Sequence, residues 1–383
     1  MTLFGRIVKN IHPEQYKRTA MFLSKHNIDT LNNIKHNINQ SLKQVKKREI
    51  MRTEYRNLGE ELQEGTYFDA KIVNQIKDKY VKTVVFDYQG EINIKLLFHF
   101  LSNSSKHNLE LYKNIMLSWL LLLKTYETPE CVKTVEVHVY LTQFKKMLEY
   151  KGSGNDDIVP LGSYNVNTGF TSRCSDYMKG KGMILLYRQE DFLKVFFHET
   201  MHLFNMEFHD TGKHTAKQII KIASDINIFE SYCETWARII NIIYYSIYNP
   251  KKDIQTLMIV ESLYSFKQAI KVLDYYNLSI EDIHNNTEKV GKLFVESSNV
   301  YSYYIVTAMF LTHPENYLTF CKTFNLNLLK FNEKHLTEYV HLLKSILESR
   351  NLITIKDVLF SENEWNNDED GASLKMTYYD IVI

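Results

Sequence analysis

The sequence predicts an α+β fold that is predominantly helical, with a small mixed or antiparallel sheet ahead of its largest helical portion. Glycine (13) and proline (5) are scarce among the 383 residues, which favours long helices over many tight turns. The stretch 134–142 alternates polar and apolar residues and is rich in β-branched side chains, a pattern typical of a strand. From residue 214 onward, apolar residues recur almost throughout with helical spacing.

The composition is that of a globular protein and disfavours several functional classes. Apolar residues make up 44% and charged residues 24% of the chain, and the net charge of +1 provides no global field that would attract nucleic acid. The longest apolar stretch, Ile115 to Leu123, is far shorter than the ~20 residues of a membrane span, and no signal-peptide pattern is present near the N-terminus. We therefore expect a cytoplasmic protein that binds neither membrane nor nucleic acid. Its widely spaced cysteines form no disulfide framework, so we expect reduced thiols.

Residues 1–130 are expected to form a mainly helical N-terminal region. Residues 1–60 are polar and basic, with twelve Lys or Arg against five Asp or Glu. They favour amphipathic helices. We expect the basic face of these helices to be solvated; the alternative is a docking arm for an acidic partner. Residues 91–126 are rich in leucine and predict two further helices. The apolar residues that set the first helical spacing are Leu23, Ile28, Leu31 and Ile34.

The predicted sheet lies within residues 131–210, together with one helix. Strands are predicted at 134–142 and 183–188, and residues 164–171 form an extended segment that turns at Gly169. A helix is expected to begin near Gln189, with acidic residues in its first turn, where the helix dipole favours them.

Residues 211–383 are expected to form a helical C-terminal portion of the same domain, which then spans 131–383. The final stretch, 373–383, predicts a terminal strand. The segments with helical periodicity are 214–224, 226–248, 253–275, 280–296, 300–312, 314–324 and 333–349.

The segment His198-Glu199-Thr200-Met201-His202 carries the clearest chemical signal. Residues four apart lie on one face of a helix, so the two imidazoles can bind one Zn²⁺ ion. Glu199 then lies close to the metal without ligating it, where it can act as the general base that takes a proton from water. The alternative is a pair of core histidines that are satisfied by hydrogen bonds.

A catalytic zinc site needs a third protein ligand and an open fourth position. Glu230 and Glu234 are one helical turn apart on a segment otherwise rich in Ile, Tyr and Trp, and two such carboxylates are costly to bury unless something neutralises them. We favour Glu230 as the ligand and Glu234 as a hydrogen-bond acceptor for a ligand histidine, although the roles could be exchanged. Neutralisation by Lys or Arg would be the alternative to a metal. His209 is a further, less well spaced candidate ligand.

Together, the His198-Glu199-x-x-His202 motif and the later Glu230-x-x-x-Glu234 pair resemble a gluzincin, an HExxH zinc metallopeptidase with glutamate as third ligand. The wider motif set, which includes residues 167–171 and 187–202, is similar to uncharacterised predicted zincins of large DNA viruses. The resemblance covers roughly residues 135–305. It implies a zincin-like catalytic core and, if the source is viral, a location in the host cytoplasm or the virion.

The resemblance also implies roles for further residues. In zincins a substrate backbone pairs with an edge strand beside the metal helix, and here Asn167, Thr168 and Gly169 are candidates for that substrate-binding segment. Gluzincins commonly use a Tyr or His to stabilise the oxyanion, and Tyr303 and Tyr304 are our candidates for this catalytic role, with Tyr301 beside them.

We therefore expect zinc-dependent hydrolysis of peptide bonds in a peptide or protein substrate. The alternative is a non-catalytic virion, structural or binding protein that retains a zinc-stabilised zincin core. A zinc hydrolase that acts on a non-peptide amide is a third possibility. Neither the cleavage specificity nor the oligomeric state follows from the sequence.

Overall fold

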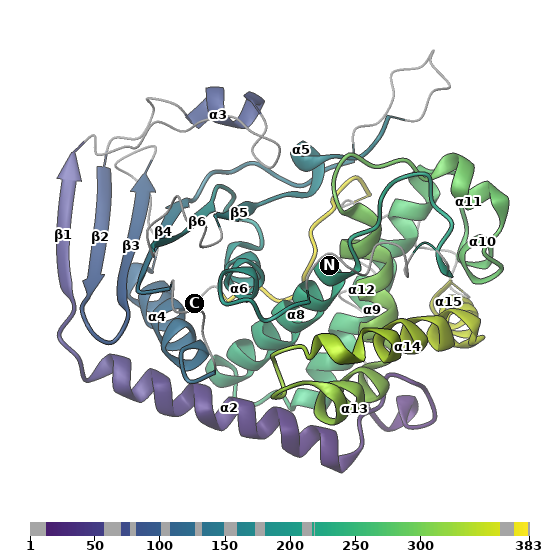
Figure 1. The fold of residues 1–383 in the computed structure, drawn as a ribbon, viewed down its shortest axis with the longest axis horizontal. Helices are drawn as coiled ribbons and strands as arrows, with labels where there is room; N and C mark the ends of the chain where they lie inside the picture. Colours follow the sequence, from purple (N-terminus) through teal and green to yellow (C-terminus); the bar gives the residue numbers. More distant parts are fainter. Residues whose placement is uncertain are drawn as a thin grey trace.

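The computed structural model combines one mixed β-sheet with a large helical body that covers one face of the sheet (Figure 1). An α+β fold is therefore confirmed, with a sheet larger than expected. The structure describes residues 13–56, 70–76, 82–100, 108–126, 132–148, 159–172, 181–208, 217, 219–360 and 371–381.

The sheet has six strands in the order β1-β2-β3-β4-β6-β5. The three central strands, β3, β4 and β6, run parallel to one another, and antiparallel pairs complete both sides. The two edge strands are β1 and β5, and β5 is the one that lies beside α6 and the helical body (Figure 1). The strands are β1 (Met51–Arg56), β2 (Lys82–Tyr88), β3 (Asn93–Phe100), β4 (Thr134–Tyr140), β5 (Gly169–Ser172) and β6 (Lys181–Leu186).

Helices supply most of the remaining structure. The longer ones are α2 (Lys25–Lys46), α4 (Leu109–Leu123), α6 (Phe192–Leu203), α8 (Ile228–Tyr248), α9 (Ile254–Tyr275), α13 (Pro314–Phe324), α14 (Leu336–Glu348) and α15 (Asn351–Phe360). The shorter ones are α3 (Ala70–Ile76), α5 (Ser163–Val166), α10 (Ile280–His284), α11 (Glu288–Leu293) and α12 (Thr307–Thr312), with 3-10 turns at Pro13–Tyr16 and Glu333–His335 and a π-helical segment, η4, at Tyr301–Val306. No helix of the described part of the chain is long and apolar enough to cross a membrane.

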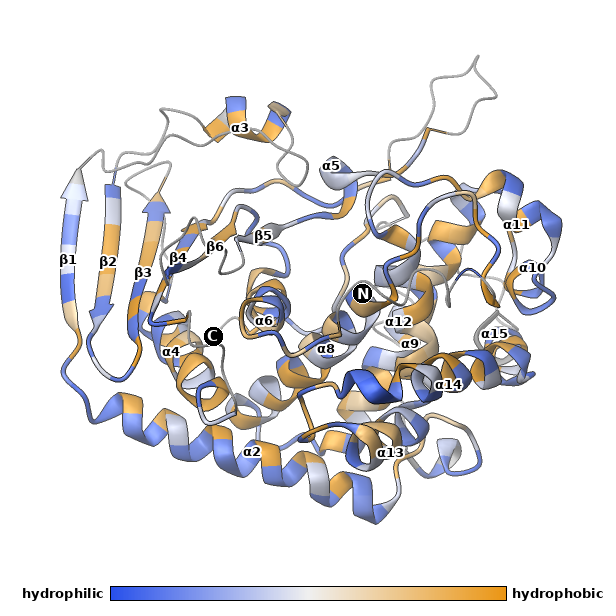
Figure 2. Ribbon diagram, viewed as in Figure 1, coloured by the Kyte–Doolittle hydropathy of each residue, from blue (hydrophilic) through white to orange (hydrophobic). Residues whose placement is uncertain are grey.

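Helix α2 shows how the sequence pattern sets the packing. Its apolar residues Leu31, Ile34, Ile38 and Leu42 are buried at helical spacing, whereas the charged residues face solvent, as the coloured stripes of Figure 2 show. The Ser24 side chain caps the N-terminus by accepting a hydrogen bond from the backbone N–H of Asn27. The helix runs along one side of the molecule beneath both the sheet and the helical body (Figure 1).

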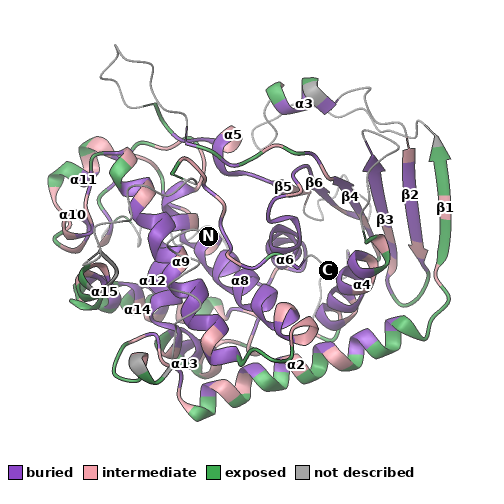
Figure 3. Ribbon diagram, turned by 180° about the vertical axis from the view of Figure 1, so that it is seen from behind, coloured by how far each residue is buried: buried purple, intermediate pink, exposed green. Residues whose placement is uncertain are grey.

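Helix α6 occupies the centre of the molecule, between the sheet and α8 (Figure 1). All twelve of its residues are buried, and the purple ribbon of Figure 3 shows that its neighbours are buried as well. The sheet contributes Val135, Val137 and Val139 to the same core. Because α6 is buried along its whole length, any charge on this helix needs a partner within the protein or a bound ion.

Several predicted elements differ from the structure. Residues 91–126 contain strand β3 followed by α4, not two helices. The described part of residues 1–130 combines helices α2, α3 and α4 with three strands of the sheet. Because β3 pairs with β4, the sheet crosses the predicted boundary at residue 130.

The terminal strand predicted at 373–383 is not formed in its described part, where one isolated bridge joins Ser373 to Met147. The first half of the extended segment 164–171 is a short helix, and residues 220–224 of the predicted helix 214–224 are not helical. Helices α8, α9, α13 and α14 confirm the predictions for their segments.

Candidate metal centre

The two motif histidines and Glu230 come from two packed helices. The helix predicted around the HExxH motif is α6, and Glu230 lies in the first turn of α8. His198, His202 and Glu230 are all less than 10% exposed. Such burial of three chemically active side chains is expensive unless they interact with one another or with a common ligand.

Three potential ligand atoms converge at this point. The Nε2 atoms of His198 and His202 are 3.0 Å apart, and Glu230 Oε2 lies 3.1 Å from the first and 3.2 Å from the second. Ligands at ~2.0–2.1 Å from a tetrahedral ion are about 3.3 Å apart, so this spacing is close to that of a zinc site. The three residues form a group able to hold a metal ion.

The outer nitrogen of each imidazole faces a carboxylate. His202 Nδ1 is 2.9 Å from Glu207 Oε1, and His198 Nδ1 is 3.2 Å from Glu234 Oε2. In a neutral ring, such an acceptor holds the hydrogen on Nδ1 and leaves a lone pair on Nε2. Two imidazole lone pairs and one carboxylate then point at the same position, which favours a cation there. The donor set of two nitrogens and one oxygen fits zinc.

The electrostatics of the site favour positive charge in the same way. Burial lowers the pKa of His198, but hydrogen bonds with Glu230 and Glu234 outweigh it and raise the pKa above its ordinary value. The pKa of His202 is raised further, because Cys233, Glu230 and Glu207 oppose the effect of burial. The pKa of Glu230 is lowered despite its burial, since both imidazoles favour the carboxylate.

Glu234 does not join the three converging atoms. Its carboxylate accepts two hydrogen bonds from Lys194 Nζ at 2.8 and 2.9 Å and one from Arg238 Nε at 2.9 Å. It is thus neutralised by cationic side chains and orients His198 from behind. The pair that the sequence leaves open is therefore divided: Glu230 lies at the candidate metal position, and Glu234 is paired with Lys and Arg.

Glu199 faces the edge of the sheet. Its Oε2 accepts a hydrogen bond of 2.7 Å from Thr171 Oγ1 on β5, and the residue is 7% exposed. The carboxylate is thus fixed between the helix that carries both histidines and the adjacent edge strand. A general base needs such a restrained position to meet its substrate proton.

The two candidate oxyanion donors, Tyr303 and Tyr304, both lie in the π-helical segment η4 but make different contacts. The Tyr303 ring lies 5.6 Å from the His198 ring, nearly perpendicular to it. Burial raises the pKa of the Tyr303 hydroxyl well above its usual value, and the carboxylates of Glu230 and Glu199 raise it further, so the hydroxyl remains a donor. The Tyr304 hydroxyl instead donates a hydrogen bond of 2.6 Å to the backbone oxygen of Leu374. Of the two, Tyr303 therefore lies beside the candidate ligand His198, whereas the Tyr304 hydroxyl is engaged by the backbone of the segment 374–378.

The three predicted substrate-binding residues have structural contacts. Asn167 accepts a hydrogen bond from Ser298, and Thr168 is buried, with its backbone oxygen bonded to the N–H of Tyr187. A Cβ atom on Gly169 would lie 2.6 Å from the backbone oxygen of Leu185, so glycine permits the close approach of β5 and β6. In the predicted extended segment 164–171, it is Thr171 that contacts the site, through its hydrogen bond to Glu199.

Four supporting residues were not identified from the sequence. Lys194 lies one turn before His198 on the same face of α6, a spacing that could have indicated it. Asn299 Nδ2 donates to Glu230 Oε1 at 3.1 Å, while Glu207 and Cys233 contact His202. Cys233 is three residues after Glu230 on α8 and Glu207 follows His202 by five residues, whereas Asn299 is brought to the site by the fold.

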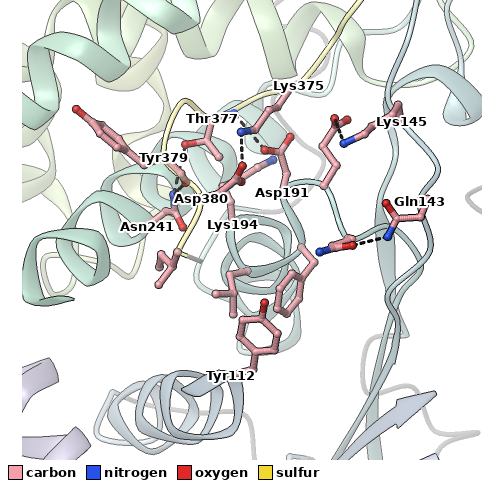
Figure 4. Close-up of a pocket in the computed structure, with 15 residues that line it drawn as sticks. Tyr112, Gln143, Lys145, Asp191, Lys194, Asn241, Lys375, Thr377, Tyr379 and Asp380 are labelled. Carbon is pink, nitrogen blue, oxygen red and sulfur yellow. Dashed lines mark hydrogen bonds and ion pairs between the residues drawn. The ribbon is translucent and has the colours of Figure 1, made fainter. Parts of the chain in front are cut away.

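Beyond Lys194, the N-terminal end of α6 carries a second group of charges (Figure 4). Asp191 Oδ2 accepts a hydrogen bond of 2.9 Å from Lys146 Nζ and another of 2.7 Å from the backbone N–H of Met376. A pocket of about 200 Å³ adjoins this end of the helix, between Tyr112 and the segment 375–381. Lys375 and Asp380, which both line this pocket, pair with each other, as a dashed line of Figure 4 shows.

The remaining candidate ligand, His209, lies outside the described residues. Comparisons with protein-family models, with curated proteins and with solved structures found no match to this chain. What can be concluded about the site therefore comes from its own geometry, which is that of a buried two-histidine, one-glutamate centre able to hold a metal ion.

Proposed function

We propose that the protein is a zinc-dependent hydrolase of peptide bonds, in which His198, His202 and Glu230 hold the metal. The observation that carries this proposal is the convergence of two Nε2 atoms and one carboxylate oxygen within 3.2 Å of one another. A zinc ion bound by these atoms would polarise the scissile carbonyl and lower the pKa of a water molecule in the open coordination position.

Each catalytic role falls to a residue beside the centre. Glu199 accepts the proton of the attacking water and later delivers it to the leaving amine. Thr171 restrains Glu199 through the bond to Oε2. The Tyr303 hydroxyl donates a hydrogen bond to the oxyanion as the carbonyl carbon becomes tetrahedral.

Glu199 distinguishes this proposal from a purely structural zinc site. It is not among the converging metal-binding atoms, and it is held by a hydroxyl on an edge strand. A structural site needs a fourth protein ligand and no free carboxylate. Among the described residues, no lysine or arginine forms an ion pair with Glu199, so its carboxylate is placed to exchange a proton with a water molecule beside the centre.

The decisive experiment compares Glu199→Gln with the wild-type protein. We expect about one zinc per chain in both, measured by mass spectrometry of metals, and a loss of peptide-library cleavage of at least about 100-fold in the variant. Glu288→Gln, on an exposed surface, is the matched control and should retain full activity.

Two outcomes would contradict the proposal. Undiminished cleavage by Glu199→Gln would remove the general base from the mechanism. Bound zinc without turnover of any peptide in the wild-type protein would support the alternative of a metal-stabilised structural or binding protein. His198→Ala is the test of the centre itself, because it should lower the zinc content without unfolding α6 from its apolar surroundings.

A further inference from the structure

Strand β1 forms the outer edge of the sheet, far from the metal centre. Within the described residues its only strand partner is β2. Two opposite views show β1 at the margin of the molecule, and its ribbon is almost entirely exposed (Figures 1 and 3). An edge strand presents backbone N–H and C=O groups that can pair with a further strand.

The side chains of β1 differ on its two faces. Met51 and Tyr55, which share one face with Thr53, are 59% and 44% exposed and belong to the small group of large apolar residues exposed on the described surface. Arg52 and Glu54 share the other face, where Glu54 Oε1 lies 2.9 Å from Arg52 Nη2 and Glu54 Oε2 lies 2.7 Å from Lys82 Nζ of β2. The strand therefore carries an apolar pair on one side and an opposite-charge pair on the other.

Symmetry limits how two copies of this strand could pair. A two-fold axis perpendicular to a continuous sheet keeps each side chain on its own face of the sheet. Two residues that are paired across the axis must therefore come from the same face of the strand. This places the axis level with one residue and not between two consecutive residues. An axis at Arg52 or at Glu54 would place like charges opposite each other, which is unfavourable. An axis at Thr53 places Arg52 opposite Glu54 of the partner subunit and Met51 opposite Tyr55 of the partner subunit.

We propose that the protein forms a homodimer through antiparallel pairing of β1 with β1 of a second copy, centred on Thr53. The two six-stranded sheets then join into one continuous sheet. By symmetry, the Arg–Glu pair and the Met–Tyr pair each occur twice around the axis, so this register satisfies both faces. The metal centres lie outside this interface, on the far side of each sheet.

The interface is small, which sets the expected strength of association. The paired strand has six residues, and interfaces below about 1,200 Å² are typical of weak complexes. We therefore expect a dissociation constant on the order of 1–100 μM and a reversible equilibrium between monomer and dimer.

Charge reversal tests the register directly by sedimentation velocity over a range of protein concentrations. Arg52→Glu makes both residues of the pair acidic, and Glu54→Arg makes both basic, so each variant alone should dissociate at least about tenfold more readily. An equimolar mixture of the two variants should recover a heterodimer, and the double swap R52E/E54R should recover a homodimer. Lys43→Glu, an exposed charge reversal on α2, is the matched control and should leave the equilibrium unchanged.

The proposal is overturned if the wild-type chain remains monomeric at protein concentrations several times above about 100 μM, the upper limit expected for the dissociation constant. It is equally overturned if a dimer forms that neither single reversal weakens, or if the mixture of variants fails to associate. Circular dichroism and zinc content verify that each variant is folded, and neither should change, because β1 is exposed and remote from the metal centre.

Discussion

The two ends of helix α6 handle buried charge in different ways. At the N-terminal end, Asp191 is paired with Lys146, and Lys194 with Glu234, at distances of 2.8–2.9 Å. At the C-terminal end, the described contacts of the Glu230 carboxylate are with His198, His202 and Asn299. One end is thus neutralised by the chain's own cations, whereas the other brings two imidazoles and a carboxylate together at one point.

This difference shows how one short helix can combine a rigid support with a binding site. The lysine pairs at the N-terminal end fix the helix to α8 and to the segment 374–378, which restrains the imidazoles one and two turns further on. The C-terminal end instead carries the group of side chains that could hold a metal ion. The two ends should therefore respond differently to substitution, to metal and to pH.

The largest expected effect is the loss of stability on Asp191→Asn. Asparagine tolerates the positive φ of 59° at this position, so the substitution mainly removes the charge and leaves Lys146, which is fully buried, without its carboxylate. We expect the free energy of unfolding to fall by about 3–5 kcal/mol, measured by denaturant unfolding. The zinc content of the remaining folded protein should be unchanged; a simultaneous loss of zinc would show that the two ends are not independent.

A smaller but selective effect is expected for the tyrosines of η4. Tyr303→Phe should lower kcat by about 100- to 1,000-fold, the usual result of removing one oxyanion donor, while zinc content and melting temperature stay close to those of the wild type. Tyr304→Phe is the matched control, because its hydroxyl bonds to Leu374; it should lower stability and leave kcat largely intact. Equal losses of kcat in both variants would contradict the assignment.

Glu207→Gln should weaken metal binding without abolishing it. The Glu207 carboxylate accepts from His202 Nδ1, and the loss of such an orienting acceptor typically costs about tenfold or more in metal affinity, or about 1.4 kcal/mol. Competition with a chromogenic chelator measures the change. Wild-type affinity in this variant would show that Glu207 does not orient the ring.

The smallest effect concerns pH and the N-terminal end. Burial raises the pKa of Glu261 to about 7, although Arg238 and hydrogen bonds from Thr377 and Tyr378 oppose the shift. Because the folded protein holds this proton more tightly than the unfolded chain, stability falls as the pH rises from about 4.5 to about 7 and then levels off. Between pH 6 and pH 8 we expect a loss of about 1 kcal/mol from this group. Glu261→Gln should remove that part of the pH dependence, and an identical profile for both proteins would contradict it.

The sequence predicted the local parts of the site well and the non-local parts poorly. Spacing alone placed His198, Glu199 and His202 on one helix and Glu230 on another, because helical periodicity is a local property. The division of roles between Glu230 and Glu234 depended on Lys194 and Arg238, which are positioned by the packing of α6 against α8. Glu207 and Asn299 reach the centre from loops, and no spacing rule connects them to it.

The fold shows the same limit. Strand β3 was predicted to be helical because it is buried on both faces, and its run Leu96, Leu97 and Phe98 lacks the alternation of a half-buried strand. The segment 373–381 was predicted as a strand, but its backbone bonds to the side chains of Asp191 and Glu261 instead of to another strand. In both segments the sequence shows correctly which residues are apolar, but it does not show which other part of the chain the segment bonds to.

The contacts of the segment 374–378 also bear on the order in which the chain can fold. Asp191 receives a backbone donor from a residue synthesised 185 positions later, and Glu261 receives a hydroxyl donor 116 positions later. While the chain is still emerging from the ribosome, the earlier parts can begin to fold, but the carboxylates at the base of α6 lack these donors. We therefore expect the N-terminal end of α6 to be held less firmly until translation has passed residue 378, and the two histidines further along the helix to take their final positions only then.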